Sequence, residues 1–148
     1  MIYCKRARKE DLPAIRLLLQ ETGKMLIDEK YLTPRDIAIQ ARDSDTGEVV
    51  GFLWCGVMAG NSLGYLDKFQ VAQSRSRQGI GNLMAKAMLA EVKRRGIRQV
   101  FGMIQQDEFH DKSAFNALKM AMASDGRDYT LVFADLPHVT AELAALGA

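Results

Sequence analysis

The spacing of apolar residues at the start of the chain predicts a strand followed by a helix. Residues 1–8 form the short strand, and Asp11 then stands where a helix N-cap is expected. Pro13 falls in the first turn, where its missing N–H removes no helical hydrogen bond. The apolar stripe of this helix consists of Ala14, Ile15, Leu18 and Leu19. Gly23 ends the helix, and a second short helix is expected over 24–33.

The middle of the chain predicts three consecutive strands. In 37–41 apolar residues alternate with polar ones, as in a strand with one buried face. The sequence Asp-Thr-Gly at 45–47 is typical of a hairpin turn, and a strongly apolar strand over 49–58 follows it. Residues 60–62 turn the chain again into a strand over 63–71. These segments indicate an antiparallel meander.

After the third of these strands the apolar positions take the period of a helix. The stripe is formed by Ile80, Leu83, Met84, Ala87 and Met88. Basic residues at 93–95 and the following Gly96 suit the last turn and the end of that helix. A strand over 97–104, a helix that begins at Asp111 and a last strand over 129–134 complete the pattern.

This order of elements predicts a single α/β domain over residues 1–148, with a mixed, mostly antiparallel sheet flanked by helices. The strand–helix–strand crossover places 63–71 and 97–104 side by side and parallel, and we expect the sheet to splay between them. Ligands tend to bind at the carboxyl ends of strands where such a sheet changes direction. In this chain that point is the end of 63–71.

Composition and charge indicate a soluble protein and limit its partners. Hydrophobic residues make up 48% and charged residues 26% of the chain, which contains 20 Lys+Arg and 18 Asp+Glu. The net charge of +2 argues against a nucleic-acid partner. The longest nearly uncharged apolar run, 49–60, is shorter than the about 20 residues that cross a membrane. Cys4 and Cys55 are expected to be reduced thiols in the core, which predicts a cytoplasmic location.

A polar loop with two glycines, residues 74–82, joins the strand over 63–71 to the long helix. Glycines let backbone approach a ligand, and the unpaired N–H groups and dipole of a helix N-terminus attract anions. Arg75 and Arg77 add mobile positive charge suited to phosphate. No Gly-Lys-Ser/Thr follows, which excludes a Walker A loop, and Met84 stands where a dinucleotide fingerprint has its third glycine. The loop therefore predicts a pyrophosphate site.

A strand that ends in Phe69-Gln70-Val71, a basic loop, Gly79-Ile80-Gly81 and a long amphipathic helix resemble motif A of the GCN5-related N-acetyltransferases (GNAT). The resemblance implies binding of acetyl-coenzyme A, with strand backbone on the pantetheine arm and loop amides on the pyrophosphate. Ser76 departs from the family pattern, which usually has Arg or Gln there. The implied cofactor residues are Phe69, Gln70, Val71, Arg75, Ser76, Arg77, Gln78, Gly79, Ile80, Gly81 and Asn82, and Asn116 is either a coenzyme contact or a surface residue.

The segment Tyr65-Leu66-Asp67-Lys68-Phe69 is similar to the corresponding strand in the acetyltransferase domain of N-acetylglutamate synthases. This similarity implies that Lys68 helps to hold the substrate, unless it is a solvated lysine on the sheet face. Those enzymes carry an arginine-containing stretch after the next strand. This chain has 101–105, Phe-Gly-Met-Ile-Gln, instead, so glutamate is not implied as the acceptor.

Two carboxylates are candidates for the proton acceptor that thioester aminolysis requires. Strict alternation puts Asp67 on an apolar face of its strand, where loss of water makes a carboxylate hold a proton more readily. The alternative is a salt-bridged structural Asp67. Glu108 lies after the strand over 97–104, where it either relays a proton or is simply solvated. His110 has too few metal-binding neighbours in sequence to predict a metal site.

The sequence thus predicts an N-acetyltransferase in which the acceptor amine attacks bound acetyl-coenzyme A directly. The alternative is a catalytically silent acyl-coenzyme A-binding protein on the same scaffold. The helix over 111–123 contains no tyrosine to protonate the leaving thiolate, which favours that alternative, as does Ser76. The acceptor is either a small-molecule amine or a protein amine. No membrane partner is expected, and the sequence leaves open whether the chain forms a homodimer.

Overall fold

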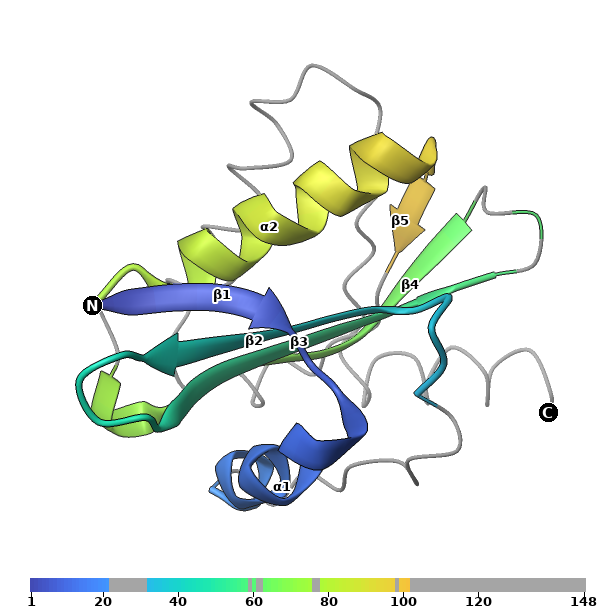
Figure 1. The fold of residues 1–148 in the computed structure, drawn as a ribbon. Coiled ribbons are helices and arrows are strands. Elements are labelled where there is room, and N and C mark those ends of the chain that lie inside the picture. The colour runs from blue at the N-terminus through green and yellow to red at the C-terminus, as the bar shows by residue number, and fades with distance from the viewer. Residues whose placement is uncertain (22–31, 59, 61–62, 76–77, 98, 102–148) are drawn as a thin grey trace, which may run out of the picture.

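The computed structural model describes residues 1–21, 32–58, 60, 63–75, 78–97 and 99–101 of the 148-residue chain (Figure 1). In these ranges a single sheet has its strands in chain order. The strands are β1 (Ile2–Arg6), β2 (Ile37–Asp43), β3 (Val49–Val57), β4 (Leu63–Val71) and β5 (Gln99–Phe101). The helices are α1 (Leu12–Gln20) and α2 (Ile80–Arg95), with 3-10 turns η1 (Lys9–Asp11) and η3 (Gln73–Arg75).

The sheet is antiparallel from β1 to β4 and becomes parallel only between β4 and β5. Leu63 pairs with Gln99 and Tyr65 with Phe101, which confirms that these two strands are neighbours. The predicted meander and the α/β class are likewise confirmed. The helix expected over 24–33, the rest of the strand over 97–104, and the elements from Asp111 onward lie outside the described residues.

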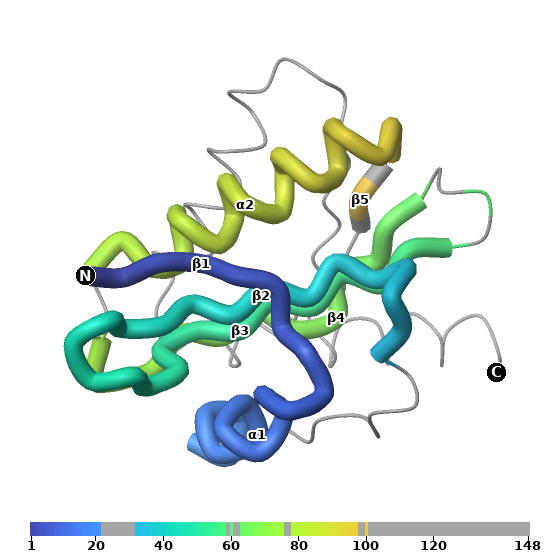
Figure 2. Tube along the Cα trace, viewed as in Figure 1, coloured from blue at the N-terminus to red at the C-terminus, as the bar shows by residue number. Residues whose placement is uncertain are grey.

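Of the two α-helices in the described ranges, one covers each face of the sheet, as Figures 1 and 2 show. The α1-side core contains Leu12, Ile15, Leu18 and Leu19 of the helix together with Ala38, Phe52 and Trp54 of the strands. The α2-side core contains Ile80, Met84, Met88 and Val92 together with Ile37, Ile39, Leu53, Leu66 and Phe69. The helices in this part of the chain are too short or too polar to span a membrane.

Strand β2 is therefore buried on both faces, and the prediction that only one face is buried was wrong. Ile37, Ile39 and Ala41 contribute to the α2-side core, as expected. Ala38 belongs to the α1-side core, and the polar Gln40 is fully buried as well. The reason is that α1 packs on the face that the alternation assigned to water.

Gly51 of β3 lets α2 approach the sheet closely. A Cβ atom at Gly51 would lie 2.8 Å from Sδ of Met84 and 3.1 Å from Cγ2 of Ile80. Such distances are far shorter than ordinary van der Waals contact, so only glycine fits without movement. The first turns of α2 are thereby held against the sheet beside the carboxyl end of β4.

Asp11 occupies the N-cap position of α1, but its side chain does not cap the helix. Its carboxylate turns instead to the sheet, where it accepts hydrogen bonds from the Arg8 N–H at 2.9 Å, Gln40 Nε2 at 2.6 Å and Arg42 Nη2 at 3.0 Å. Burial alone would raise the pKa of Asp11, but these hydrogen bonds and the charges of Lys5 and Arg42 outweigh it and lower the pKa. The expected capping role is replaced by a link between the β1–α1 connection and β2.

Candidate active site

A β-bulge interrupts β4 in the middle of its pairing with β3. Trp54 pairs with Lys68 and Cys55 pairs with Leu66, which leaves Asp67 as the extra residue. A bulge resets the alternation of side chains along its strand. Bulges occur often beside active sites, because they re-aim side chains there.

The bulge corrects the predicted faces of β4. Leu66 and Phe69 both pack in the α2-side core although they are three residues apart. Asp67 and Lys68 between them therefore lie on the opposite face, the side on which α1 packs. The expectation that Asp67 and Phe69 share a face was wrong, because simple alternation has no place for an extra residue.

Asp67 is half-buried and only loosely paired. Its side chain is 24% exposed, and its Oδ2 atom is buried without a hydrogen-bond partner. Lys68 Nζ lies 3.9 Å from that oxygen, at the limit of an ion pair. No other ion pair of Asp67 occurs within the described ranges, so the alternative of a structural salt bridge to a neighbouring strand finds no partner there.

The amino end of α2 forms an open backbone site just beyond β4. Gly79 has φ +75°, a left-handed conformation that side-chain-bearing residues adopt only with strain, and no side chain caps the helix. A Cβ atom at Gly79 would meet nothing within 4 Å. The first N–H groups of the helix, from Ile80 to Asn82, have no partner within the helix itself. The predicted loop-to-helix junction with a left-handed glycine is confirmed, and Gly79 is exposed.

Side chains around this junction are divided between the core and the surface. Ile80 is only 1% exposed and packs in the α2-side core. Gln78 and Gly79 are exposed, Asn82 is half-buried and Gly81 is buried. A ligand at this junction would therefore meet Gln78, Gly79 and the partly exposed Asn82.

Arg75 is held in place, in contrast to the mobile charge that the sequence suggested. Its Nη1 atom lies 2.8 Å from Asp43 Oδ2, and its Nη2 atom lies 3.5 Å from Glu48 Oε2. The N–H of Asp45 and the guanidinium of Arg75 keep the pKa of Asp43 below its ordinary value. Arg75 thus fastens η3 to the β2–β3 hairpin.

A second anchor of the loop comes from the end of α1. The backbone N–H of Gln73 donates a hydrogen bond of 3.1 Å to Glu21 Oε2, and the N–H of Ala72 donates one of 2.9 Å to the Val50 carbonyl. Residues 72–75, which lead into the junction, are therefore held by the β2–β3 hairpin, by β3 and by the end of α1. Ser76 and Arg77, and the more distant candidates Glu108 and Asn116, lie outside the described residues.

The carboxyl half of β4 has no partner strand on one edge within the part of the chain that is described. There β5 pairs only with residues 63–65. Phe69 and Gln70 are buried and Val71 is half-buried, so their side chains belong to the sheet and its cores. The role of Phe69, Gln70 and Val71 in binding a coenzyme stays a prediction.

The two cysteines are poorly suited to nucleophilic catalysis. Cys55 is fully buried, and burial, reinforced by the charge of Asp36 and opposed by Arg95, raises the pKa of its thiol to about 12. Cys4 is half-buried, and burial raises its pKa as well. Because the thiolate is the nucleophile, a raised pKa makes both thiols weak nucleophiles near neutral pH.

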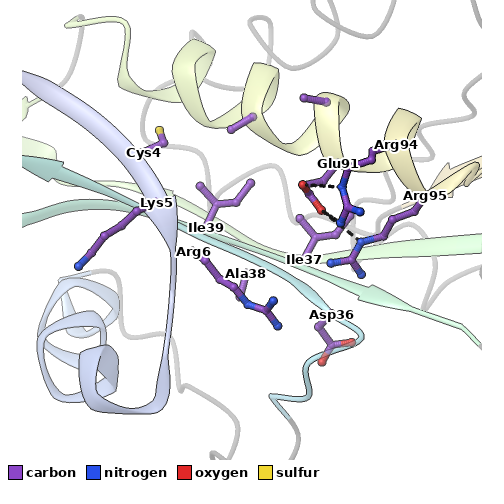
Figure 3. Close-up of a pocket in the computed structure, with 12 residues that line it drawn as sticks. Cys4, Lys5, Arg6, Asp36, Ile37, Ala38, Ile39, Glu91, Arg94 and Arg95 are labelled. Carbon is purple, nitrogen blue, oxygen red and sulfur yellow. Dashed lines mark hydrogen bonds and ion pairs between the residues drawn. The ribbon is translucent and has the colours of Figure 1, made fainter.

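A groove of about 390 Å³ lies away from this site, between α2 and the strands β1 and β2 (Figure 3). Five charged side chains that line it, those of Arg6, Asp36, Glu91, Arg94 and Arg95, already have partners. Glu91 binds Arg94 at 2.9 Å and Arg95 at 3.2 Å, and Arg6 donates to the Pro34 carbonyl at 3.0 Å. The carboxylate of Asp36 accepts hydrogen bonds from two backbone N–H groups. The bulge is different in that it leaves Asp67 Oδ2 without a hydrogen-bond partner.

Comparison with known proteins gives one family and a consistent fold. The model of the acetyltransferase (GNAT) family matches residues 6–115. The chain is similar in structure to the ribosomal-protein-S18-alanine N-acetyltransferase from Escherichia coli, with TM-score 0.65 and 18% identity over 81% of this chain and 76% of that one. No curated protein matches the chain.

Two aminoglycoside-modifying enzymes have a similar fold. An aminoglycoside acetyltransferase from an uncultured soil metagenomic sample has TM-score 0.63 and 19% identity over 81% of this chain and 86% of that one. An aminoglycoside 6'-N-acetyltransferase complexed with coenzyme A has TM-score 0.55 and 23% identity over 64% of this chain and 57% of that one. At these identities the likeness shows the fold alone.

Proposed function

Because the chain belongs to the acetyltransferase (GNAT) family, we propose that it transfers the acetyl group of acetyl-coenzyme A to an amine acceptor by direct attack. The observation that carries the proposal is the arrangement at the end of β4. An accessible, uncapped helix N-terminus at Gly79 follows a strand whose bulge presents the carboxylate of Asp67. The first feature suits an anion and the second suits a proton acceptor.

The open junction fits the pyrophosphate of the coenzyme. Gly79 keeps its backbone clear of side chains, the first amides of α2 have no helical partners, and the helix dipole is positive there. The residues assigned to the pyrophosphate are 78–82, and the backbone edge of 69–71 is assigned to the pantetheine arm. Because Arg75 is engaged by Asp43, the amides and the dipole carry most of this attraction. The bound coenzyme supplies an acetyl group activated as a thioester.

Asp67 is the residue that we assign to the proton of the acceptor. An alkyl ammonium has a pKa near 10.4, so near neutral pH the acceptor must lose a proton before its nitrogen can attack. The carboxylate of Asp67 has an oxygen without a hydrogen-bond partner, and so it has capacity to accept that proton. As the extra residue of the bulge, Asp67 also lacks a regular hydrogen-bonding partner in the sheet. Its backbone N–H is a candidate for polarising the acetyl carbonyl.

Direct attack is favoured over an acetylated cysteine intermediate. The raised pKa values of both thiols leave almost no thiolate near neutral pH. Lys68, on the same face as Asp67, is assigned to holding the acceptor. Glutamate is not proposed as the acceptor, since the comparisons give no support to a specific likeness to N-acetylglutamate synthases. The acceptor class is a small-molecule amine or a protein amine.

The test has two stages. Calorimetric titration with acetyl-coenzyme A should show binding, and a screen of small amines and peptides should then show release of free coenzyme A. Absence of binding refutes the proposal. Binding without transfer to any amine supports the alternative of a catalytically silent acyl-coenzyme A-binding protein.

A further inference from the structure

Two buried side-chain polar atoms lack a hydrogen-bond partner within the described ranges, and both belong to the bulge. They are Nε1 of Trp54 and Oδ2 of Asp67. Buried polar groups are nearly always paired, and a buried tryptophan N–H usually finds an acceptor. The concentration of both exceptions at one place therefore points to a ligand that satisfies them.

The two atoms lie on neighbouring strands and on the same face of the sheet. Trp54 pairs directly with Lys68, and Asp67 is the bulge residue beside that pair. The side chain of Trp54 is almost completely buried, at 6% exposed, whereas Asp67 is 24% exposed. Asp67 is thus partly accessible to solvent, and Trp54 beside it belongs to the α1-side core.

The chemistry of the two groups is complementary. An indole N–H only donates a hydrogen bond, and an ionised carboxylate only accepts one. Although they are neighbours, they do not bond to each other. A molecule that satisfies both must bring an acceptor atom for Trp54 and an N–H or O–H for Asp67.

We propose that Trp54 is a specificity-determining residue that recognises an oxygen close to the amine of the acceptor. This inference rests on the proposed acetyl transfer and narrows its substrate class. The favoured acceptors are α-amino carbonyl compounds and amino alcohols, whose oxygen accepts from Trp54 while the amine donates to Asp67. Simple alkylamines have no such oxygen and leave the Trp54 N–H unpaired.

The reaction itself shows why the amine nitrogen cannot satisfy both Asp67 and Trp54. The lone pair of the amine nitrogen forms the new N–C bond to the acetyl carbon, and the C–S bond breaks to give the coenzyme thiolate. The first proton of the ammonium leaves to solvent by way of Asp67 before attack, and the N–H proton released on attack passes through Asp67 to neutralise the thiolate. The lone pair is therefore not available to Trp54, which needs a second acceptor atom. Sites with such buried donors strongly disfavour ligands that lack the matching group.

The test is a thermodynamic cycle. It combines removal of one N–H from the enzyme with removal of one oxygen from the substrate. Rates of coenzyme A release are measured for glycinamide and for propylamine with the wild type and with Trp54→Phe, which keeps an aromatic ring but removes the N–H. We expect kcat/KM for glycinamide to fall about tenfold to a hundredfold, and that for propylamine to change less than about twofold. Differences in amine basicity cancel, since each substrate is compared with itself.

Phe52→Leu is the matched control, because Phe52 is also buried in the α1-side core on β3 and has no polar atom. It should change both substrates alike. Equal effects of Trp54→Phe on the two amines, or no effect, overturn the inference, and so does a wild type that shows no preference for oxygen-bearing amines. The last measurement needs no variant, so poor folding of Trp54→Phe does not prevent a decision. Failure to acetylate any amine or peptide of the screen described above instead refutes the proposed function.

Discussion

The glycine at the start of α2 offers the most direct test of the coenzyme site. Gly79 has φ +75°, and a Cβ atom there would meet nothing within 4 Å. Substitution by alanine thus adds backbone strain without a clash, which costs about 1–2 kcal/mol. At this chain length, that corresponds to a drop in Tm of about 2–8 °C.

Gly96 at the other end of α2 provides the matched control. It has φ +71° and equally open surroundings, so Gly96→Ala should lower Tm by a similar amount. It lies at the carboxyl end of the helix, where no anion is expected. Coenzyme A affinity should therefore be unchanged in Gly96→Ala and reduced in Gly79→Ala.

Gly79→Asp adds a negative charge where the pyrophosphate is expected. Two unit charges about 4 Å apart repel by about 4 kcal/mol at an effective dielectric constant near 20, and solvent lowers this value at an open site. We expect coenzyme A to bind about tenfold to a thousandfold more weakly. The measurements are calorimetric titration and thermal unfolding. Wild-type affinity in Gly79→Asp, or an equal loss of affinity in Gly96→Ala, would refute the assignment.

Three further predictions concern the reaction and the fold. Asp67→Asn should lower kcat by about 10²–10⁴ with unchanged binding of acetyl-coenzyme A, and steady-state kinetics showing full activity at neutral pH would contradict this assignment. The double variant Cys4→Ala/Cys55→Ala should stay active, and an acetylated thiol detected by mass spectrometry would disprove direct attack. Because the pKa of Asp43 is lowered in the fold, its stabilising effect is present above its unfolded-state pKa near 3.9 and is lost as pH falls through the lowered value. Denaturant unfolding of wild type and Asp43→Asn should thus differ most near neutral pH and converge in acid, whereas a gap independent of pH would contradict the role of Asp43.

Sequence patterns predicted those parts of the fold that local chemistry determines. Gly79 and Gly96 mark the two ends of α2, because each stands where the backbone must turn left-handed. The hairpin at 45–47 and the strand boundaries near Leu63 follow from turn residues in the same way. The open helix N-terminus was therefore predictable as a candidate site from its glycines and polar residues alone.

The rest of the site depends on partners that are distant in sequence. Periodicity gives no sign that Asp67 is an extra residue, because only the pairing of β4 with β3 shows it. Arg75 has the appearance of a solvated charge until the fold places Asp43 beside it. Asp11 matches a helix cap until Gln40 and Arg42 compete for its carboxylate. The unpaired N–H of Trp54 has no sequence signature at all, since a tryptophan in an apolar strand normally indicates core packing.

Strands β2 and β3 are covered by a helix on each face. This covering determines how their amide protons exchange with solvent. Each of these strands is also paired with a neighbouring strand on both edges. A local fluctuation that moves α1 away from the sheet leaves the opposite face under α2, and the ladder hydrogen bonds stay closed. Amide protons in the middle of β2 and β3 therefore exchange with water only when the sheet as a whole opens. Their exchange rates then measure the global free energy of unfolding, whereas those of β1, an edge strand that is partly exposed, report smaller local openings.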